Sequence, residues 1–261
     1  MKLLALIFAY TASHYVSNPQ RLRQFDWYQS WIIWLSKRLK GFNAEFSIIV
    51  IVALPVLLIS LVTFLFFNSM IGSLLVSIFI LSYCIGPESL QEDVNSGDIR
   101  KRLGIRSNAT ISTLIKKITQ VAMRRWFAVF FWYMVLGLVG VLLYRLSERL
   151  DHFTKVSDGN KPAITRLLAI LNYPVAWMMV MLLAIASDFE RIYKKCKPFL
   201  NMKTITSMDD SFLYEATDFA VENCEVEPED NSSIEQVSIR VLKRMLVVCL
   251  VFVSILVIFA V

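Results

Sequence analysis

Residues 126–149 read WFAVFFWYMVLGLVGVLLYRLSER, and this stretch decides the class of fold. No charged side chain occurs between Trp126 and Tyr144, and charged residues stand at both ends of the run. A run of this length with charged ends is typical of a helix that crosses a bilayer, whose hydrocarbon core is about 30 Å thick. We therefore predict a membrane span over 126–144.

The composition of the whole chain agrees with a membrane protein. Hydrophobic residues make up 56% of the 261 residues and charged residues 18%, which is more apolar and less charged than a typical soluble domain. The alternating ten-residue strands of a β-barrel are absent from the sequence. The prediction is an all-α, polytopic helical membrane protein with five or six transmembrane spans plus interfacial and cytoplasmic helices, forming one domain over 1–261.

A second long apolar stretch predicts a helical hairpin. The 42 residues from Phe46 to Pro87 carry no charge. As one helix they would be about 63 Å long, about twice the hydrocarbon thickness. We therefore expect two spans, 47–66 and 70–86, with a turn near Asn68 and a kink at Pro55.

Three further segments are candidate spans. Residues 167–187 are charge-free but contain Asn172 and Pro174, which predicts a broken span that faces the interior of the bundle, or a kinked structural helix. Residues 245–261 are long enough for a last span. Residues 1–17 are apolar and short, and we interpret them as an uncleaved first span or a re-entrant helix.

The segment 21–40 predicts an amphipathic helix. Its apolar residues recur at helical spacing, and basic residues flank them. Two arrangements fit this pattern: a helix that lies in the membrane interface and a helix that packs on the other spans. The residues of the apolar face are Phe25, Tyr28, Trp31, Ile32, Leu35 and Leu39.

Two long polar segments remain, 87–125 and 188–239. The first is basic and predicts two helices, the second of them starting at a Ser or Asn cap. The other segment is basic up to Lys203 and then acidic, and 225–236 is expected to be a flexible linker. The apolar face expected in the first segment consists of Ile111, Leu114, Ile115, Ile118 and Val121.

The distribution of basic residues predicts an orientation. Segments 18–46, 87–125 and 188–244 contain 5, 8 and 8 Lys or Arg, and 145–163 contains four. The positive-inside rule then makes the three long segments cytoplasmic and places both termini outside. The positive-inside rule accounts for the excess of Lys and Arg at the ends of the spans, so this excess does not imply nucleic-acid binding. The expected partners are the lipid bilayer and a protein on the cytoplasmic side.

Motifs for catalysis or cofactor binding are missing from the sequence. It contains no Walker A, GxGxxG or GxSxG pattern. The four cysteines show no CxxC spacing and there are only two histidines, so we expect no metal site. Gly137 and Gly140 form a GxxG pattern that helix packing explains better than phosphate binding.

Charged residues that follow two of the predicted spans are candidate binding residues. Arg145 and Glu148 share a helix face with Arg149 and His152. A second group, Asp188 to Arg191, follows the fifth span, on the opposite side of the membrane in the six-span topology. The alternative for both groups is that they are collar charges that extend to water.

The sequences of 127–146 and of 166–179 (the latter RLLAILNYPVAWMM) resemble the AmpE family of bacterial inner-membrane proteins. That family is related to the CobD/CbiB family of cobalamin biosynthesis. IGPESLQEDV at 85–94 and a last span at the C-terminus also fit. The residues that carry the resemblance are Phe131-Trp132, Gly137, Gly140, Tyr144-Arg145, Asn172, Pro174 and Gly97-Asp98.

What the resemblance implies divides into two functions. AmpE-like proteins are signalling modulators linked to β-lactamase induction and cell-wall recycling. Their CobD/CbiB relatives are enzymes that form an amide with ATP. Where those relatives carry acids before the Phe-Trp span this chain has IKKITQVAMRRW, and where they carry Pro-Ala-Arg it has Pro174-Val175-Ala176-Trp177. An enzyme that holds ATP and Mg²⁺ needs such charges, so the missing ones argue against the synthase.

The sequence therefore predicts a non-catalytic, multi-pass regulatory protein of the bacterial inner membrane, without a cofactor. The first alternative is a membrane-embedded amide-forming ligase that uses ATP and Mg²⁺ on another carboxylate, and a weaker alternative is a small-solute carrier. The candidate ligand-binding residues are Arg145, Glu148, Asn172, Pro174 and Asp98.

Overall fold

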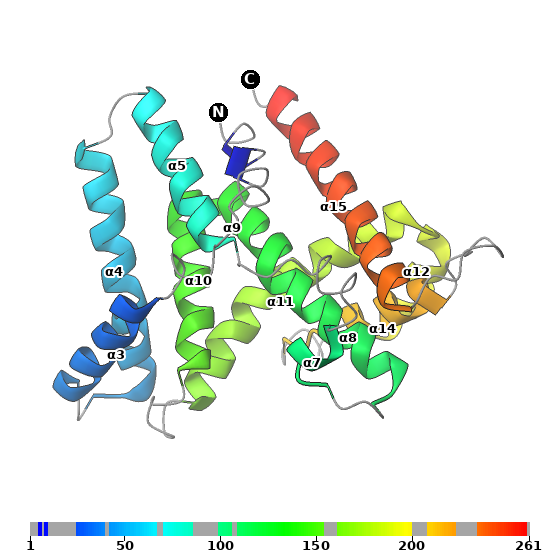
Figure 1. The fold of residues 1–261 in the computed structure, drawn as a ribbon, viewed down its shortest axis with the longest axis horizontal. Helices are drawn as coiled ribbons and strands as arrows, with labels where there is room; N and C mark the ends of the chain where they lie inside the picture. The colour runs from blue at the N-terminus through cyan, green and yellow to red at the C-terminus, as the bar shows by residue number, and fades with distance from the viewer. Residues whose placement is uncertain are drawn as a thin grey trace. The chain divides into compact units, whose positions relative to one another are not determined.

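The structure is a computed structural model that describes residues 5–6, 8–9, 25–39, 42–66, 70–85, 99–105, 109–153, 161–199, 208–222 and 234–259. All regular secondary structure in these residues is helical, as the sequence predicts. The main helices are α3 (Asp26–Arg38), α4 (Ala44–Phe66), α5 (Met70–Cys84), α7 (Ile99–Arg102), α8 (Ile111–Ala122), α9 (Ala128–Leu136), α10 (Leu138–His152), α11 (Lys161–Ala186), α12 (Phe189–Cys196), α14 (Ser211–Glu222) and α15 (Ile234–Phe259) (Figure 1).

The chain divides into two compact units, where the sequence predicts one domain. Unit 1 comprises Met1–Pro87 and Ala128–Leu171, and unit 2 comprises Glu88–Phe127 and Asn172–Val261. Both boundaries at 127 and 171 fall inside helical stretches, so neither is marked by the Gly-, Pro- or Ser-rich linker that signals a domain boundary in a sequence.

In unit 1 the two helices predicted over 47–66 and 70–86 are confirmed as α4 and α5, and the expected turn near Asn68 lies outside the described residues. α4 continues through Pro55 without a break. Because proline has no N–H, the carbonyl of Ile51, one turn earlier, loses its helical partner. The indole Nε1 of Trp31 on α3 donates a hydrogen bond to this oxygen at 3.3 Å. A tryptophan on a neighbouring helix thus replaces the missing backbone donor.

Helix α3 packs on α4, so the packed alternative for the segment 21–40 holds for Asp26–Arg38. Phe25, Tyr28, Ile32 and Leu35 of the predicted apolar face are buried, and Trp31 is half-buried. Trp27 and Trp34, on the other side of the helix, are 45% and 49% exposed. The outer face of the same helix, which carries the exposed tryptophans, is suited to the membrane interface.

The prediction of one continuous helix over 126–144 is wrong. α9 ends at Leu136, α10 begins at Leu138, and Gly137 between them has φ 66° and ψ −147°. This backbone region is essentially restricted to glycine. α9 and α10 pack against each other, and Figure 1 shows them side by side, joined at one end. The apolar run is therefore a hairpin of two short helices that reverses at a single residue.

Gly140 allows the two arms of this hairpin to approach each other. A Cβ atom at position 140 would lie 2.5 Å from the carbonyl oxygen of Trp132 and 2.7 Å from the Cβ of Leu136. Both distances are shorter than any real side chain tolerates. The two glycines of the GxxG pattern thus have different roles: Gly137 supplies the turn and Gly140 the close contact. α10 also packs on α4 and α5.

Unit 2 gathers the polar helices that are far apart in the sequence. α8 packs on α14 and on α15, and α12 packs on α14. Leu114, Ile115 and Ile118 of the predicted apolar face of α8 are fully buried, whereas Ile111 is 48% exposed. Thr110 precedes α8 where a Ser or Asn cap is predicted, and its side chain makes no capping hydrogen bond. The expected linker 225–236 overlaps the start of α15 at Ile234, and 223–233 lie outside the described residues.

α11 is continuous through Pro174, so the prediction of a broken helix is wrong. Asn172 is 6% exposed, which confirms that this part of the helix faces the protein interior. The carbonyl of Leu171, in the turn before Pro174, accepts a hydrogen bond from the indole Nε1 of Trp132 at 3.3 Å. The carbonyl that Pro174 leaves without a helical N–H is that of Ile170, so this bond adds a tie between helices and does not replace the missing donor as Trp31 does in α4.

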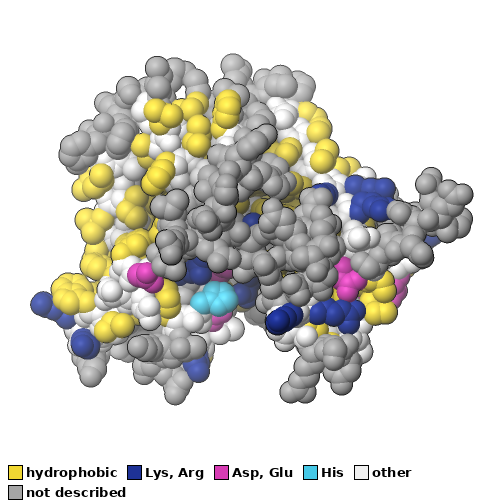
Figure 2. All heavy atoms as spheres, in the orientation of Figure 1, with side chains coloured by type: hydrophobic (Ala, Val, Ile, Leu, Met, Phe, Trp, Pro, Cys, Tyr) yellow, Lys and Arg dark blue, Asp and Glu magenta, His cyan; other side chains and the backbone are white. Residues whose placement is uncertain are grey.

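Among the described residues, two helical stretches are long and apolar enough to cross a membrane: Glu45–Phe64 and Lys161–Ala186. They differ in burial within the protein. In α4 33% of the most apolar window is buried, whereas in α11 56% is buried. Figure 2 shows hydrophobic side chains exposed over α4 and α5, with Lys and Arg side chains near α3. The exposed face of α4 is thus suited to lipid, and α11 has more of the character of a core helix.

The glycine geometry gives a test. We expect Gly140→Ala to destabilise the purified protein by about 3 kcal/mol, because backbone atoms block the new methyl group, and Gly137→Ala by about 1–3 kcal/mol through backbone strain alone. Thermal unfolding in detergent measures both, and Val139→Ala, at an exposed position of the same turn, is the control. Unchanged stability of Gly140→Ala would contradict the hairpin packing.

Candidate functional site

Arg145 and Glu148 form an ion pair inside unit 1. The guanidinium Nη1 of Arg145 donates to Oε2 of Glu148, one turn later on α10. The two residues are only 5% and 7% exposed, and Ser147 beside them is fully buried. The interpretation of these charges as collar residues that extend to water is therefore wrong for this pair. His152, predicted on the same face, is exposed.

The neighbouring Arg149 lies in an aromatic cluster. Its guanidinium carbon is 4.9 Å from the centre of the Phe25 ring. Phe25 also contacts Tyr83, with ring centres 4.7 Å apart, and Trp27 Nε1 donates to the Tyr83 hydroxyl at 3.3 Å. This cluster joins the start of α3 to the ends of α5 and α10.

Tyr28 carries another buried polar group in this region. Its side chain is fully buried, and its hydroxyl has no hydrogen-bond partner among the described residues. Burial raises the pKa of Tyr28 because the phenolate would lose its hydration. The ring contacts Phe153 just beyond α10, with centres 6.3 Å apart. The group is suited to structural packing, and its hydroxyl stays neutral at physiological pH.

The predicted candidate residues are divided between the two units. Arg145 and Glu148, in unit 1, are in direct contact. Asn172 and Pro174 belong to the part of α11 that lies in unit 2. Asp98 lies outside the described residues.

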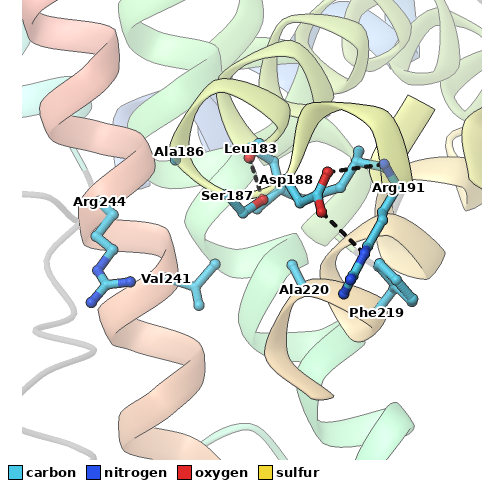
Figure 3. Close-up of a pocket in the computed structure, with 10 residues that line it drawn as sticks. Leu183, Ala186, Ser187, Asp188, Arg191, Phe219, Ala220, Val241 and Arg244 are labelled. Carbon is cyan, nitrogen blue, oxygen red and sulfur yellow. Dashed lines mark hydrogen bonds and ion pairs between the residues drawn. The ribbon is translucent and has the colours of Figure 1, made fainter. Parts of the chain in front are cut away.

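Unit 2 contains an open pocket that the sequence does not predict. Its volume is about 530 Å³, and it lies where α11 ends, between α12, α14 and α15 (Figure 3). Arg191 and Arg244 come from different helices and border it on different sides (Figure 3). The remaining lining residues are Leu183, Ala186, Ser187, Asp188, Ile192, Phe219, Ala220 and Val241.

The carboxylate in this pocket already has partners. Asp188 is the N-cap of α12: its side chain accepts a hydrogen bond from the backbone N–H of Arg191 at 3.2 Å. It also forms an ion pair with Nε of the same arginine at 3.1 Å. The hydroxyl of Ser187 donates to the carbonyl of Leu183 at 2.7 Å. These groups hold the turn between α11 and α12, and the pocket presents cationic and apolar surface to a ligand.

A second hollow adjoins the pocket. Its volume is about 540 Å³, and it shares Ala186 and Arg244 with the first one. Three basic side chains, Arg240, Lys243 and Arg244, line it, and none of the described residues around it is acidic. The apolar lining residues are Ile185, Ala186, Val247 and Val248. This hollow can bind an anionic group next to an apolar one.

Elsewhere in unit 2, polar contacts join α8 to α14. The ammonium of Lys116 lies 4.9 Å from the centre of the Tyr214 ring, whose hydroxyl donates to Asp210 at 3.0 Å. Burial, followed by the charge of Asp210, raises the pKa of Tyr214. Burial and the nearby Glu215 raise the pKa of Cys196 to about 11. That thiol is therefore protonated at neutral pH, which makes it a poor nucleophile.

A metal-binding arrangement is not found in the described part of the chain, where no three His, Cys, Asp or Glu side chains gather. The pocket itself could be found from the sequence only in part. Asp188 and Arg191 are visible as a charged group after an apolar run. Phe219, Val241 and Arg244 come from two helices, α14 and α15, and no sequence pattern indicates that they line a pocket with Asp188 and Arg191.

The buried ion pair gives a second test. We expect Glu148→Gln or Arg145→Met alone to destabilise the protein by about 3–5 kcal/mol. The first variant leaves the buried charge of Arg145 without its partner, and the second leaves that of Glu148. The double variant Arg145→Met with Glu148→Leu is expected to recover most of this loss. Unfolding in detergent measures the cycle, with Arg166→Met at an exposed pair as the control. Additive losses in the double variant would contradict the pairing.

The comparisons with known proteins leave the function to be argued from the geometry. The two features available are the buried pair of unit 1 and the cationic, apolar hollows of unit 2. The resemblance to the AmpE family accordingly remains an expectation from the sequence. No protein-family model, no curated protein and no solved structure matches the chain.

Proposed function

We propose that this chain is a regulatory protein of the bacterial inner membrane, similar to the AmpE family, whose polar unit meets a protein partner in the cytoplasm. One observation carries the proposal: the helices α8, α12, α14 and α15, far apart in the sequence, pack into one unit. Arg100 on α7 pairs with Glu235 on α15 at 3.1 Å, which adds a long-range tie to the helix contacts. A polar platform joined to apolar helices is suited to pass a signal from the membrane to a partner.

The apolar helices support a membrane location. Leu57, Leu61 and Phe64 on α4 are 66%, 54% and 74% exposed, and Phe79 on α5 is 72% exposed. Such a surface is costly in water and favourable in lipid. α15 is a 26-residue helix that carries no charge after Arg244. We propose that α4, α5 and α15 cross the bilayer.

The hairpin suggests fewer crossings than the expected five or six. From Trp126 to Leu136 the apolar run is about 16 Å long, about half of the hydrocarbon thickness. From Leu138 to Tyr144 it is about 10 Å long before the charged residues begin. Val135, Leu136 and Val139 at the turn are 56%, 50% and 40% exposed. We propose that this hairpin enters the bilayer and returns to the same side.

Chain connectivity then constrains α11. The hairpin returns the chain to the side of α8, so α11 begins on that side. α12 follows α11 directly and packs on α14, which packs on α8. α11 therefore ends on the side where it began. In this proposal it is a buried helix, which agrees with its larger buried fraction and with the buried Asn172.

This topology satisfies the positive-inside rule more fully than the expected one. Six spans leave the four basic residues of 145–163 outside. In the topology with a hairpin, every Lys and Arg from Arg21 to Arg244 lies on the cytoplasmic side. The ion pair of Glu45 and Arg166, 3.4 Å apart, agrees with this topology. Glu45 lies at the start of α4 and Arg166 near the start of α11, and the topology places both helix starts on the cytoplasmic side.

Cysteine labelling tests the topology. In a cysteine-free background, single cysteines replace Ser69, Ser107 and Ser157, and a membrane-impermeant maleimide is added to intact spheroplasts. We expect Ser69→Cys to be labelled from outside, and Ser107→Cys and Ser157→Cys only after lysis. Labelling of Ser157→Cys together with Ser69→Cys would support six spans and sink the hairpin topology.

Regulation is tested in the cell. We expect deletion of the gene to change β-lactamase induction by a β-lactam, and the wild-type chain to restore it. Lys117→Glu, on the exposed side of α8, should fail to restore induction while the protein level stays normal, because the reversed charge alters the partner surface. Leu57→Ala, on the lipid-facing side of α4, is the control. Unaltered induction in the deletion strain would contradict the proposal.

The amide-forming ligase is the second candidate, and the buried Arg145–Glu148 pair favours it, since buried charges often mark functional sites. It is expected to hydrolyse ATP in the presence of an amine and a carboxylate substrate. Loss of that turnover in Asn172→Ala with unchanged stability would establish it. The pairing of the carboxylates Glu148 and Asp188 with arginines favours the regulatory function instead.

A further inference from the structure

We propose that the hollow between the end of α11 and α15 binds the phosphate headgroup of an anionic membrane lipid, with the lipid's acyl chains along α15. This site rests on the membrane location proposed above. It adds a ligand to that function: a lipid from the cytoplasmic leaflet bound at the junction of the polar unit and the membrane.

The charge of the hollow selects an anion. Arg240, Lys243 and Arg244 lie within about one turn of α15, and the lining residues that the structure describes include no acid. Arginine presents a planar fork of donors that matches phosphate oxygens, and lysine adds a mobile point charge. A single phosphate can therefore be contacted by more than one of these residues.

The apolar surface that continues from the hollow selects a lipid among anions. Val247, Val251 and Ile255 recur every four residues on α15 and are 58%, 53% and 46% exposed. This stripe begins beside the basic residues. A molecule with a phosphate at one end and hydrocarbon at the other matches this order of cationic and apolar surface.

The position in the chain agrees with this occupant. Arg244 is the last charged residue before the apolar run of α15, so it stands where the proposed span enters the bilayer. Basic residues at this level attract anionic lipids of the cytoplasmic leaflet. The adjoining pocket shares Arg244 and adds the exposed Ser187, which gives the polar part of a large headgroup room to extend (Figure 3).

Native mass spectrometry of the purified full chain in detergent tests the site, with phosphatidylglycerol and phosphatidylcholine added at equal concentration. We expect preferential retention of phosphatidylglycerol. The double variant Lys243→Gln with Arg244→Gln should weaken this retention about 30-fold. Lys101→Gln with Lys117→Gln removes two exposed charges from the same unit and is the matched control.

A second variant separates the lipid from free phosphate. Val247→Ser with Val251→Ser should weaken retention of long-chain phosphatidylglycerol and leave binding of glycerol phosphate unchanged. Equal losses in the control variant, or full displacement of the lipid by inorganic phosphate, would overturn the proposal. The β-lactamase assay stands apart from this measurement, so a failure of lipid binding leaves the regulatory function to be judged by its own result.

Discussion

The reversal of the chain at Gly137 is the constraint on which the rest of the structure depends. A residue with φ 66° and ψ −147° cannot be accommodated inside a helix, so α9 ends before it and α10 returns along α9. The close contact at Gly140 fixes how tightly the two helices pack. α10 then lies against α4 and α5, and its polar residues at 145 and 148 are enclosed by protein. The buried ion pair follows from the turn, because charges enclosed in this way must be paired with each other.

Backbone polar groups are satisfied by the same kind of helix-to-helix contact. The indole of Trp31 donates to the carbonyl of Ile51, which Pro55 leaves without its helical N–H, and the indole of Trp132 donates to the carbonyl of Leu171, three residues before Pro174. In an apolar environment no water would supply such a donor. The tryptophans that sequence reasoning assigns to the membrane interface or to a family signature thus also have a structural role inside the protein.

Much of the fold can be predicted from apolar length and periodicity. The helices α4 and α5, the buried face of α3 and the core of α8 all follow from these signals. The single span over 126–144 does not, because an apolar run of 19 residues reads the same whether it crosses a bilayer or turns back at one glycine. Pro174 misleads in the opposite direction, since a proline inside α11 leaves the helix unbroken. The hollows of unit 2 bring residues from the end of α11 together with residues of α15, which depends on the three-dimensional arrangement and not on local pattern.

The central claim is that the chain reverses between α9 and α10, and a distance measurement tests it most directly. Nitroxide labels at Phe131 and Asp151 report the separation of the two helices by pulsed electron paramagnetic resonance on the protein in nanodiscs. A continuous helix would place these positions about 30 Å apart. The hairpin brings them to within about 20 Å, since packed helix axes are about 8–10 Å apart and the remaining offset is short. A single distance distribution near 30 Å would contradict the account.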